Sequence, residues 1–349
     1  MKKDEKKHRN ISELGEFGLI DHITKNVKIN HKNTIKGIGD DAAVIDYGNV
    51  CSVVTTDLLV EGIHFNLIYT PLKHLGYKSV VVNLSDIYAM NATPKQITVS
   101  IAISAKFTVE HIEQIYEGIN LACQHYNVDL VGGDTSSSLT GLSISITAIG
   151  ESKKEDIVYR NTAKKNDILC VTGNLGAAYM GLQLLEREKE IFKANPGTQP
   201  SLEGYDYILQ RQLKPEARED IISLFDEIGI KPTSMIDISD GLSSEIMHIC
   251  KKSDVGCKIF QDKIPIDLNT EKMGKEFNIE PLIAALNGGE DYELLFTIDI
   301  NDLEKIKDYK MIHPIGHIAD KEHGAVMITN SGQSIELQAQ GWNQLKDEE

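Results

Sequence analysis

The sequence contains no long apolar run, few aromatic residues and one tryptophan, and its five cysteines are widely spread. No two cysteines form a C-x-x-C pair, so the sequence signals neither a zinc site nor a disulfide framework. The apolar stretches fall short of the ~20 residues that span a bilayer, and the charged N-terminus lacks the apolar segment of a signal peptide. We therefore expect a cytoplasmic protein with buried, reduced cysteines.

Positive charge is also scarce. The chain has 36 Lys and Arg residues against 52 Asp and Glu residues, and its formal net charge is −16. This balance argues against nucleic acid or an anionic membrane as the main partner. A protein this acidic that binds a phosphorylated ligand must take cations from elsewhere, and divalent metal ions are the simplest source.

The length and composition indicate an ordinary globular protein of the α/β (α+β) class. A chain of 349 residues is longer than one core usually supports, so we expect two domains. The charged stretch Glu151–Asp156 is a plausible boundary between them. We predict a disordered N-terminal extension over residues 1–11, an N-terminal domain over 12–150 and a C-terminal domain over 151–349.

Local patterns predict several elements. A β-rich run over Val50–Thr56 predicts a strand that ends at Asp57, and a helical period predicts a helix over Leu72–Asn91. A short apolar strand over Val128–Val131 leads into two glycines. A further helix is predicted over Ala177–Glu186, followed by a charged surface excursion.

Seven aspartates lie in five short segments, and we expect these where strands give way to loops or helices. One such segment alone is more often a turn or a helix cap, but five together indicate a site. Like charges gathered in this way need cations between them, which predicts a site with several Mg²⁺ ions that holds phosphates. The segments are Gly39-Asp40-Asp41-Ala42, Thr55-Thr56-Asp57, Asn83-Leu84-Ser85-Asp86, Gly132-Gly133-Asp134-Thr135 and Asp237-Ile238-Ser239-Asp240-Gly241.

The common nucleotide-binding motifs do not account for these segments. Residues Gly37–Ala42 fit the dinucleotide pattern G-x-G-x-x-A, but their two aspartates would repel a pyrophosphate. No P-loop pattern occurs, and an EF-hand loop begun at Asp237 would place Gly241 at a ligand position. The remaining ligand set of carboxylate, hydroxyl and carbonyl oxygens suits Mg²⁺ or Ca²⁺.

Four other features stay open between a structural and a binding role. The turn Thr172–Gly176 can present N–H groups to an anion or connect a strand to a helix. His64 follows the second acidic segment, and Arg160 is a candidate for balancing phosphate charge. Trp342 can stack on a ligand or pack in the core.

In this order, the acidic segments resemble the thiamine-monophosphate kinase family. The resemblance includes Gly62-Ile63-His64-Phe65 and Gly288-Gly289-Glu290-Asp291-Tyr292-Glu293-Leu294, and it covers roughly Gly15 to Trp342. It implies a two-domain, synthetase-like α/β fold that forms a homodimer through the mixed sheets of the N-terminal domains. It also implies ATP as co-substrate and direct in-line phosphorylation of thiamine monophosphate to thiamine diphosphate.

The resemblance further implies which residues hold magnesium. The metal ligands would be Asp41, Thr55, Thr56, Asp57, Asp86, Asp134, Asp237 and Asp240, with Asp40 as a second choice within its pair. Because a phosphate acceptor is already ionised near neutral pH, no strong general base is required. The catalytic residues would then be the metal ligands themselves, namely Asp57, Asp86, Asp134 and Asp237.

Two more sets follow from the same resemblance. The ATP contacts would come from Tyr116, Gly133, Asp134, Arg160 and Ser239. The contacts with thiamine monophosphate would come from His64, Glu290 and Trp342.

Other members of the wider superfamily fit less well. Selenophosphate synthetase needs a Cys or selenocysteine in a glycine-rich N-terminal segment, whereas the first cysteine here is Cys51, inside a predicted strand. The hydrogenase maturation protein needs a C-terminal cysteine, and aminoimidazole ribonucleotide synthetase is weaker on the Ser-Asp-Gly and Gly-Gly-Glu-Asp segments. A rival of another class is a non-enzymatic acidic protein that binds metal without ATP.

Overall fold

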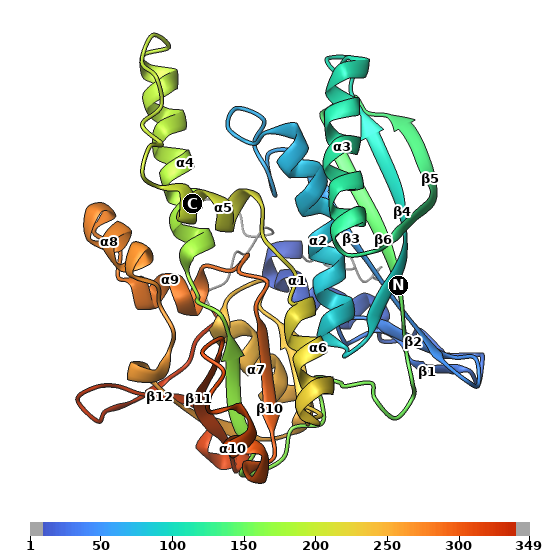
Figure 1. Ribbon diagram of the computed structural model, residues 1–349, viewed down its shortest axis with the longest axis vertical. Helices are drawn as coiled ribbons and strands as arrows, with labels where there is room; N and C mark the ends of the chain where they lie inside the picture. Colours follow the sequence, from blue (N-terminus) through green and yellow to red (C-terminus); the bar gives the residue numbers. More distant parts are fainter. Residues whose placement is uncertain (1–9, 340–349) are drawn as a thin grey trace, which may run out of the picture.

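The computed structural model describes residues 10–339, which form two mixed β-sheets with helices packed on them (Figure 1). The first sheet has the strand order β1-β2-β3-β6-β4-β5, and its neighbours are antiparallel except for β4 and β5. Its strands are β1 (Thr34–Lys36), β2 (Ala43–Asp46), β3 (Cys51–Val60), β4 (Thr93–Ile103), β5 (Asp129–Ser137) and β6 (Ser143–Ser152).

The second sheet has the order β13-β12-β9-β11-β7-β10-β8, with β9 and β12 as its parallel pair. Two mixed sheets confirm the predicted mixed α/β class. The strands are β7 (Ile168–Thr172), β8 (Ser234–Asp237), β9 (Gly256–Phe260), β10 (Leu294–Ile298), β11 (Ile312–Ala319), β12 (Ala325–Ile328) and β13 (Ser334–Glu336).

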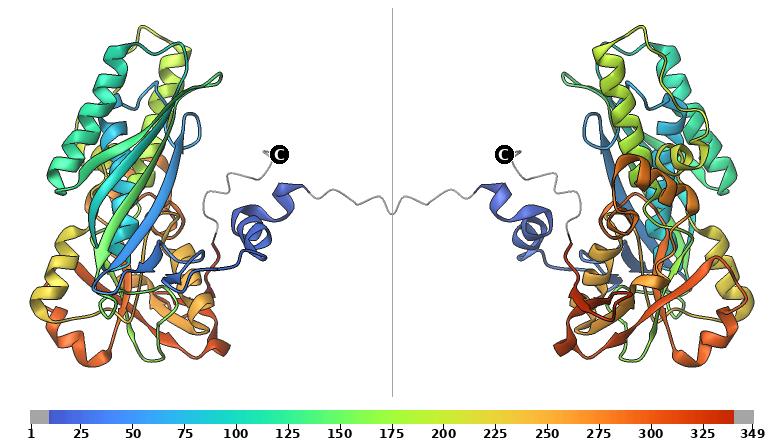
Figure 2. Two further views of the ribbon diagram at one scale, coloured as in Figure 1. Left: turned by 90° about the vertical axis from the view of Figure 1, so that its right-hand side faces the viewer. Right: turned by 90° about the vertical axis from the view of Figure 1, so that its left-hand side faces the viewer.

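Helices α2 and α3 lie along one side of the first sheet, and α6 and α7 pack against the second (Figures 1 and 2). The α-helices are α1 (Gly15–Thr24), α2 (Leu72–Ala89), α3 (Val109–His125), α4 (Ala177–Ala194), α5 (Asp206–Leu213), α6 (Glu219–Ile228), α7 (Leu242–Ser253), α8 (Leu268–Phe277), α9 (Pro281–Asn287) and α10 (Leu303–Ile306). The 3₁₀ helices are η1 (Ile11–Glu13), η2 (Gln261–Lys263), η3 (Ile300–Asp302) and η4 (Lys321–His323).

Helix α2 is the central element because it is buried on every side between the two halves of the protein. Its contact with α3 is very close, since a Cβ added at Gly76 would lie 1.9 Å from the carbonyl oxygen of Ile115. A Cβ at Gly118 of α3 would lie equally close to the carbonyl oxygen of Lys73. Apolar residues of α2 and α3 belong to one core with those of α6 and one face of the second sheet. Side chains of α2 are therefore held rigidly between both halves.

The helix predicted over Leu72–Asn91 is confirmed as α2, but other predicted boundaries are wrong. The strand expected to end at Asp57 continues to Val60, because β3 stays paired with β6 as far as Ser143. Likewise β5 runs through Asp134, which pairs with β4 instead of following a strand. Asp57 and Asp134 thus lie inside strands.

Two further boundaries differ from expectation. Helix α4 continues to Ala194, so the predicted surface excursion begins inside a helix whose buried residues include Glu188. The 3₁₀ helix η1 begins at Ile11, within the segment predicted to be disordered, and residues 1–9 lie outside the described part. The domain boundary between residues 150 and 151 stays a prediction. No helix among residues 10–339 is long and apolar enough to cross a membrane.

Candidate active site

A cavity of about 650 Å³ opens between the two halves of the protein, and its lining is strongly acidic. Among residues 10–339, nine carboxylates line it, whereas only two basic side chains besides histidine do so, Arg160 and Lys189. The cavity size is ordinary for a small-molecule site, but the charge opposes any anionic ligand that comes without cations. The carboxylates are Asp40, Asp41, Asp57, Asp86, Glu186, Asp237, Asp240, Glu245 and Glu290.

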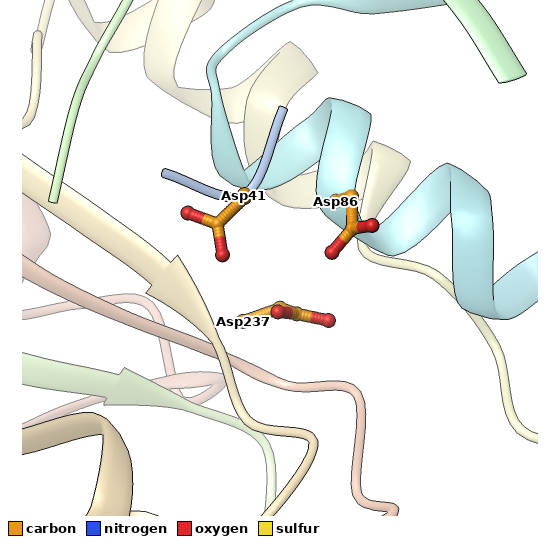
Figure 3. Close-up of side chains that lie close together, drawn as sticks. All are labelled: Asp41, Asp86 and Asp237. Carbon is orange, nitrogen blue, oxygen red and sulfur yellow. The ribbon is translucent and has the colours of Figure 1, made fainter. Parts of the chain in front are cut away.

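Asp41, Asp86 and Asp237 converge on one point of this cavity (Figure 3). Their candidate ligand oxygens all lie within 4.8 Å of one another. Asp41 comes from the loop between β1 and β2, Asp86 from α2, and Asp237 from the end of β8. Three elements that are distant in sequence thus place three carboxylates where one ion can contact them all.

Hydrogen bonds fix two of these carboxylates and the neighbouring Asp57. The Oγ1 atom of Thr55 donates to Oδ2 of Asp86 at 2.6 Å, and Oγ of Ser85 donates to Oδ2 of Asp237 at 2.6 Å. The backbone N–H of Asp57 donates to the side-chain oxygen of Asn83 on α2 at 2.9 Å. These hydrogen bonds hold the side chains of the cluster in place.

Burial raises the pKa values of these carboxyl groups. It raises the pKa of Asp41 to about 7, although the Arg160 guanidinium acts against the rise. Burial likewise raises the pKa of Asp57 to about 6 and that of Asp237 to about 6. The pKa of Asp86 lies well above its usual range because of burial and because three other carboxylates surround it. Ionising all of them together requires compensating positive charge.

The cluster fits a hard divalent cation. Oδ2 of Asp41 is buried and has no hydrogen-bond partner among the described residues. Burying a carboxylate oxygen without a hydrogen-bond partner costs free energy unless an ion or a water molecule contacts that oxygen. Carboxylate oxygens at this spacing are the ligand set that Mg²⁺ takes, usually together with water and phosphate oxygens.

Arg160 occupies the rim of the cluster. Its guanidinium forms an ion pair with Asp41, its Nε lies 3.6 Å from Oδ1 of Asp40, and its backbone N–H donates to the same oxygen at 3.2 Å. Lys36 also pairs with Asp40 at 2.8 Å. Asp40 therefore has two basic partners, whereas Asp41 shares Arg160 with it and faces the other two carboxylates.

The loop that carries Ser239 and Asp240 packs against the loop that carries Glu290. The backbone N–H of Glu290 donates to the carbonyl oxygen of Ser239 at 2.7 Å. Gly289 has a φ of +69°, and a Cβ there would lie 2.4 Å from the same oxygen, so this position requires glycine. The N–H of Asp240 donates to the buried carboxylate of Glu245 on α7 at 3.0 Å. Both loops line the cavity.

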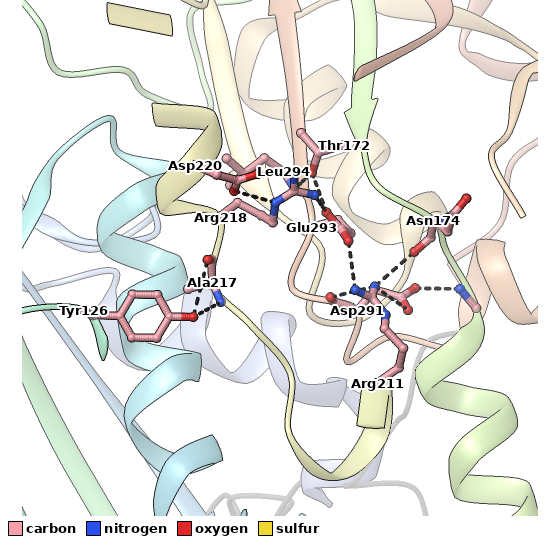
Figure 4. A network of polar contacts seen from close by, with 11 residues as sticks. Tyr126, Thr172, Asn174, Arg211, Ala217, Arg218, Asp220, Asp291, Glu293 and Leu294 are labelled. Carbon is pink, nitrogen blue, oxygen red and sulfur yellow. Dashed lines mark hydrogen bonds and ion pairs between the residues drawn. The ribbon is translucent and has the colours of Figure 1, made fainter. Parts of the chain in front are cut away.

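A buried ionic network stands behind the Glu290 loop (Figure 4). The carboxylate of Glu293 accepts hydrogen bonds from Arg211 at 2.9 Å, from Thr172 at 2.6 Å and from Arg218. Burial alone would raise the pKa of Glu293, but the two guanidinium groups outweigh it and lower the pKa. Asp291 accepts a bond from the Gly176 N–H at 2.8 Å. This network fixes the base of the loop.

The turn at Thr172–Gly176 has a structural role. The N–H of Gly173 donates to Met311, that of Leu175 to Pro265, and that of Gly176 to Asp291. These N–H groups are used within the protein, so they do not form the anion site that the sequence left open.

His64 lies in the cavity lining, together with Phe65 and Tyr69 of the loop that follows β3. Its Nδ1 accepts the backbone N–H of Val60 at 3.0 Å, which orients the ring. The Oη of Tyr69 donates to Glu186 on α4 at 2.9 Å, and this bond joins the loop to the opposite wall.

Several predicted site residues lie away from this cavity. Thr56 lies on the exposed face of β3, where its hydroxyl donates to the carbonyl oxygen of Ile146 at 3.1 Å. Gly133 and Asp134 are exposed on the edge strand β5, and Tyr116 lines a smaller apolar hollow beside α3. Trp342 lies outside the described residues.

Sequence reasoning did not select Lys78, Glu186 or Tyr69, which lie in or beside the site. Lys78 is 4% exposed and contacts Glu290. The signal that could have found it is its position eight residues before Asp86, on a helix whose neighbouring residues are mostly apolar. Glu186 and Tyr69 carry no such signal, because only the folded chain brings them together.

Known proteins resemble this chain in sequence and in fold. The family described as AIR synthase related protein, N-terminal domain, matches residues 39–152. Thiamine-monophosphate kinase of Bacillus subtilis is 36% identical over 95% of this chain and 100% of its own length. The Aquifex aeolicus enzyme of the same name is 35% identical over 82% of this chain and 87% of its own.

A solved structure described as AaThiL complexed with AMPPCP and TMP has a TM-score of 0.82 to this fold. It is 32% identical in sequence, and the alignment covers 96% of this chain and 99% of that one. A hydrogenase maturation protein, HypE, has a TM-score of 0.66 at 17% identity, which shows a shared fold alone. The chain belongs to the thiamine-monophosphate kinase family.

Proposed function

We propose that this protein transfers the γ-phosphoryl group of ATP directly to thiamine monophosphate, giving thiamine diphosphate and ADP. The observation that carries the proposal is the convergence of Asp41, Asp86 and Asp237 at one point of an acidic cavity. Such a cavity suits a reaction in which two phosphorylated substrates meet, provided that cations accompany them.

We propose several Mg²⁺ ions as those cations. Asp41, Asp86 and Asp237 would hold one of them, and Asp57, Asp240 and Thr55 would coordinate further ions. Magnesium bound there would neutralise the repulsion between the phosphates and the charge on the transferred group.

The side chains of the protein mainly bind and orient. The acceptor oxygen of a phosphate monoester is already ionised near neutral pH, so the site needs no group to remove a proton. This agrees with His64, whose Nδ1 is occupied by a backbone N–H. We propose that His64, Glu290 and Trp342 contact thiamine monophosphate and that Arg160 and Ser239 contact ATP. Arg160 would then exchange its pairing with Asp41 for a phosphate.

We propose a homodimer formed through the face of the first sheet that α2 and α3 do not cover. This face presents uncharged residues such as Leu58, which is 54% exposed, and Ser100, which aligns with Asp134 across β4 and β5. The strand β5 is an open edge, and such edges pair readily with another chain. A second copy would then carry its Gly133, Asp134 and Tyr116 to the partner's cavity, which explains why they stand apart in one chain.

We also propose that the protein works in the cytoplasm and that its two domains meet near residue 150. All five cysteines are buried and free, which suits a reducing compartment.

The decisive experiment is to incubate the protein with ATP, Mg²⁺ and thiamine monophosphate and to separate the products by chromatography. We expect thiamine diphosphate and ADP in equal amounts, and neither product in EDTA. ADP with free phosphate but no thiamine diphosphate would instead indicate another synthetase of the superfamily. Magnesium binding without any effect of ATP on the melting temperature would indicate a non-enzymatic metal-binding protein.

A further inference from the structure

Lys78 is a buried basic residue of the central helix α2. Its side chain is 5% exposed, and its Nζ contacts Oε2 of Glu290 and donates to the main-chain oxygen of Gln212 at 3.1 Å. An ammonium group removed from water is costly unless a carboxylate and further hydrogen bonds compensate it. Burying Lys78 therefore costs free energy, and the carboxylate of Glu290 offsets this cost.

Glu290 is held from three directions. Besides Lys78, Nε2 of Gln212 donates to Oε2 at 3.2 Å, and the Oη of Tyr292 donates to Oε1 at 3.0 Å. Glu290 adopts a left-handed backbone conformation with a φ of +59°, which residues other than glycine and asparagine rarely adopt. Strained backbone and three donors together fix a carboxylate that still lines the cavity and is 29% exposed.

The same helix connects this carboxylate to the cluster of Asp41, Asp86 and Asp237. Lys78 lies eight residues before Asp86, which is ~12 Å along the axis of an α-helix. Between them, Asn83 accepts the N–H of Asp57. One rigid element therefore sets the position of Glu290 relative to this carboxylate cluster.

We propose that Lys78 is a positioning residue for thiamine monophosphate, an inference that rests on the function proposed above. The phosphate of the substrate must face the acidic cluster, so its cationic heterocyclic end falls on the wall that includes Glu290. Lys78 holds the Glu290 carboxylate so that it points into the cavity, at a fixed distance from Asp86. Lys78 itself does not touch the substrate.

The test compares Lys78→Met with Lys73→Met, a change of the same kind on the same helix. Lys73 is 51% exposed and pairs with Glu117 at the surface. For Lys78→Met we expect the KM for thiamine monophosphate to rise about tenfold or more, the scale of one lost charge-assisted contact, while the KM for ATP changes less than about twofold. Lys73→Met should leave both values unchanged.

A double mutant separates positioning from a general effect on folding. If Lys78 acts through Glu290, Lys78→Met should add nothing to the KM increase already caused by Glu290→Gln. Additive effects, or an equal rise in both KM values for Lys78→Met, would overturn the proposal.

Should Lys78→Met not fold, Gln212→Ala decides the question. This change removes the Nε2 donor to Glu290 but keeps the main-chain oxygen that Lys78 contacts. An increase in the KM for thiamine monophosphate alone, smaller than the one expected for Lys78→Met, would support the proposal. Unchanged kinetics would overturn it. Wild-type protein that forms no thiamine diphosphate would refute the proposed function itself, which is a separate outcome.

Discussion

The hydroxyl of Thr55 donates a 2.6 Å hydrogen bond to Oδ2 of Asp86 and so ties the middle of β3 to α2. The adjacent Thr56 points to the other face of the sheet and bonds to the main chain of β6. Two threonines that are neighbours in sequence thus have different surroundings, because successive side chains of a strand face opposite sides. Only Thr55 faces the carboxylate cluster within one chain.

This difference predicts unequal effects of two matched substitutions. Thr55→Val leaves Asp86 without its donor, so we expect the magnesium concentration for half-maximal activity to rise about tenfold, the scale of a lost hydrogen bond to a charged group. Thr56→Val should raise it less than about threefold. Magnesium titrations of initial rate check this. Equal effects would mean that both hydroxyls face metal, as the family resemblance implies.

Asp86→Asn tests the proposed magnesium site directly. The substitution removes a charge from the centre of the cluster while keeping its shape, so we expect kcat to fall by about a hundredfold or more, the scale of a lost electrostatic contact in a transition state. The magnesium requirement should rise as well. Initial rates at several magnesium concentrations measure both effects, and near-normal turnover at low magnesium would contradict the proposed multi-metal site.

The raised pKa values of the cavity aspartates predict how stability depends on pH. The pKa values of Asp41, Asp57 and Asp237 rise from 3.8 to about 7, 6 and 6 in the folded protein. Between pH 4 and 7 the folded state therefore binds more protons than the unfolded state, and metal-free stability falls as pH rises through this window. Magnesium reverses the trend because it binds the ionised groups.

Melting temperatures in EDTA and in magnesium, from pH 5 to 8, measure this effect. The stabilisation by magnesium should be small at pH 5 and largest at pH 8. Asp86→Asn serves as the matched variant, since removing one charge should flatten the slope in EDTA. A metal-free protein that gains stability between pH 5 and 8 would contradict the raised pKa values.

The ionic network behind the Glu290 loop predicts a large stability loss. Glu293→Gln leaves the buried guanidinium groups of Arg211 and Arg218 without their shared anion, which costs about 3–5 kcal/mol of unfolding free energy. The exposed pair of Arg187 and Glu276 is the control, because Glu276→Gln should cost less than ~1 kcal/mol. Denaturant unfolding measures both, and similar losses would contradict the structural role of the network.

Most residues of the site could be predicted from the sequence, but their arrangement in space could not. The acidic segments of Asp41, Asp86 and Asp237 carry local signals that depend only on neighbouring residues, and the structure does bring them together. The contact of Lys78 with Glu290 spans 212 residues in sequence. No local pattern reports such a pairing, because it depends on how α2, α5 and the loop before β10 pack.

The strand boundaries near Asp57 and Asp134 differ from the sequence-based expectation for a related reason. The glycines and aspartates there are weak strand formers, so local propensity ends the strands early. Pairing with β6 and β4 extends both strands through these residues, since hydrogen bonding across a sheet overrides local preference. In the proposed homodimer Asp134 reaches a site only through a second copy of the chain, which no single-chain pattern can place.

The proposed homodimer predicts that a charge on the open face of the first sheet separates the subunits. Ser100→Arg places a guanidinium on β4 beside Ser145 and Asp134, where a second copy would have to bury it. We expect a monomer that melts near the wild-type temperature but has lost most of its ATP affinity, because Asp134 no longer reaches the partner's cavity. Ser334→Arg, on the exposed edge strand β13, is the matched control and should remain dimeric. Sedimentation and nucleotide calorimetry measure the two effects, and a wild-type protein that is monomeric at full activity would rule out a shared site.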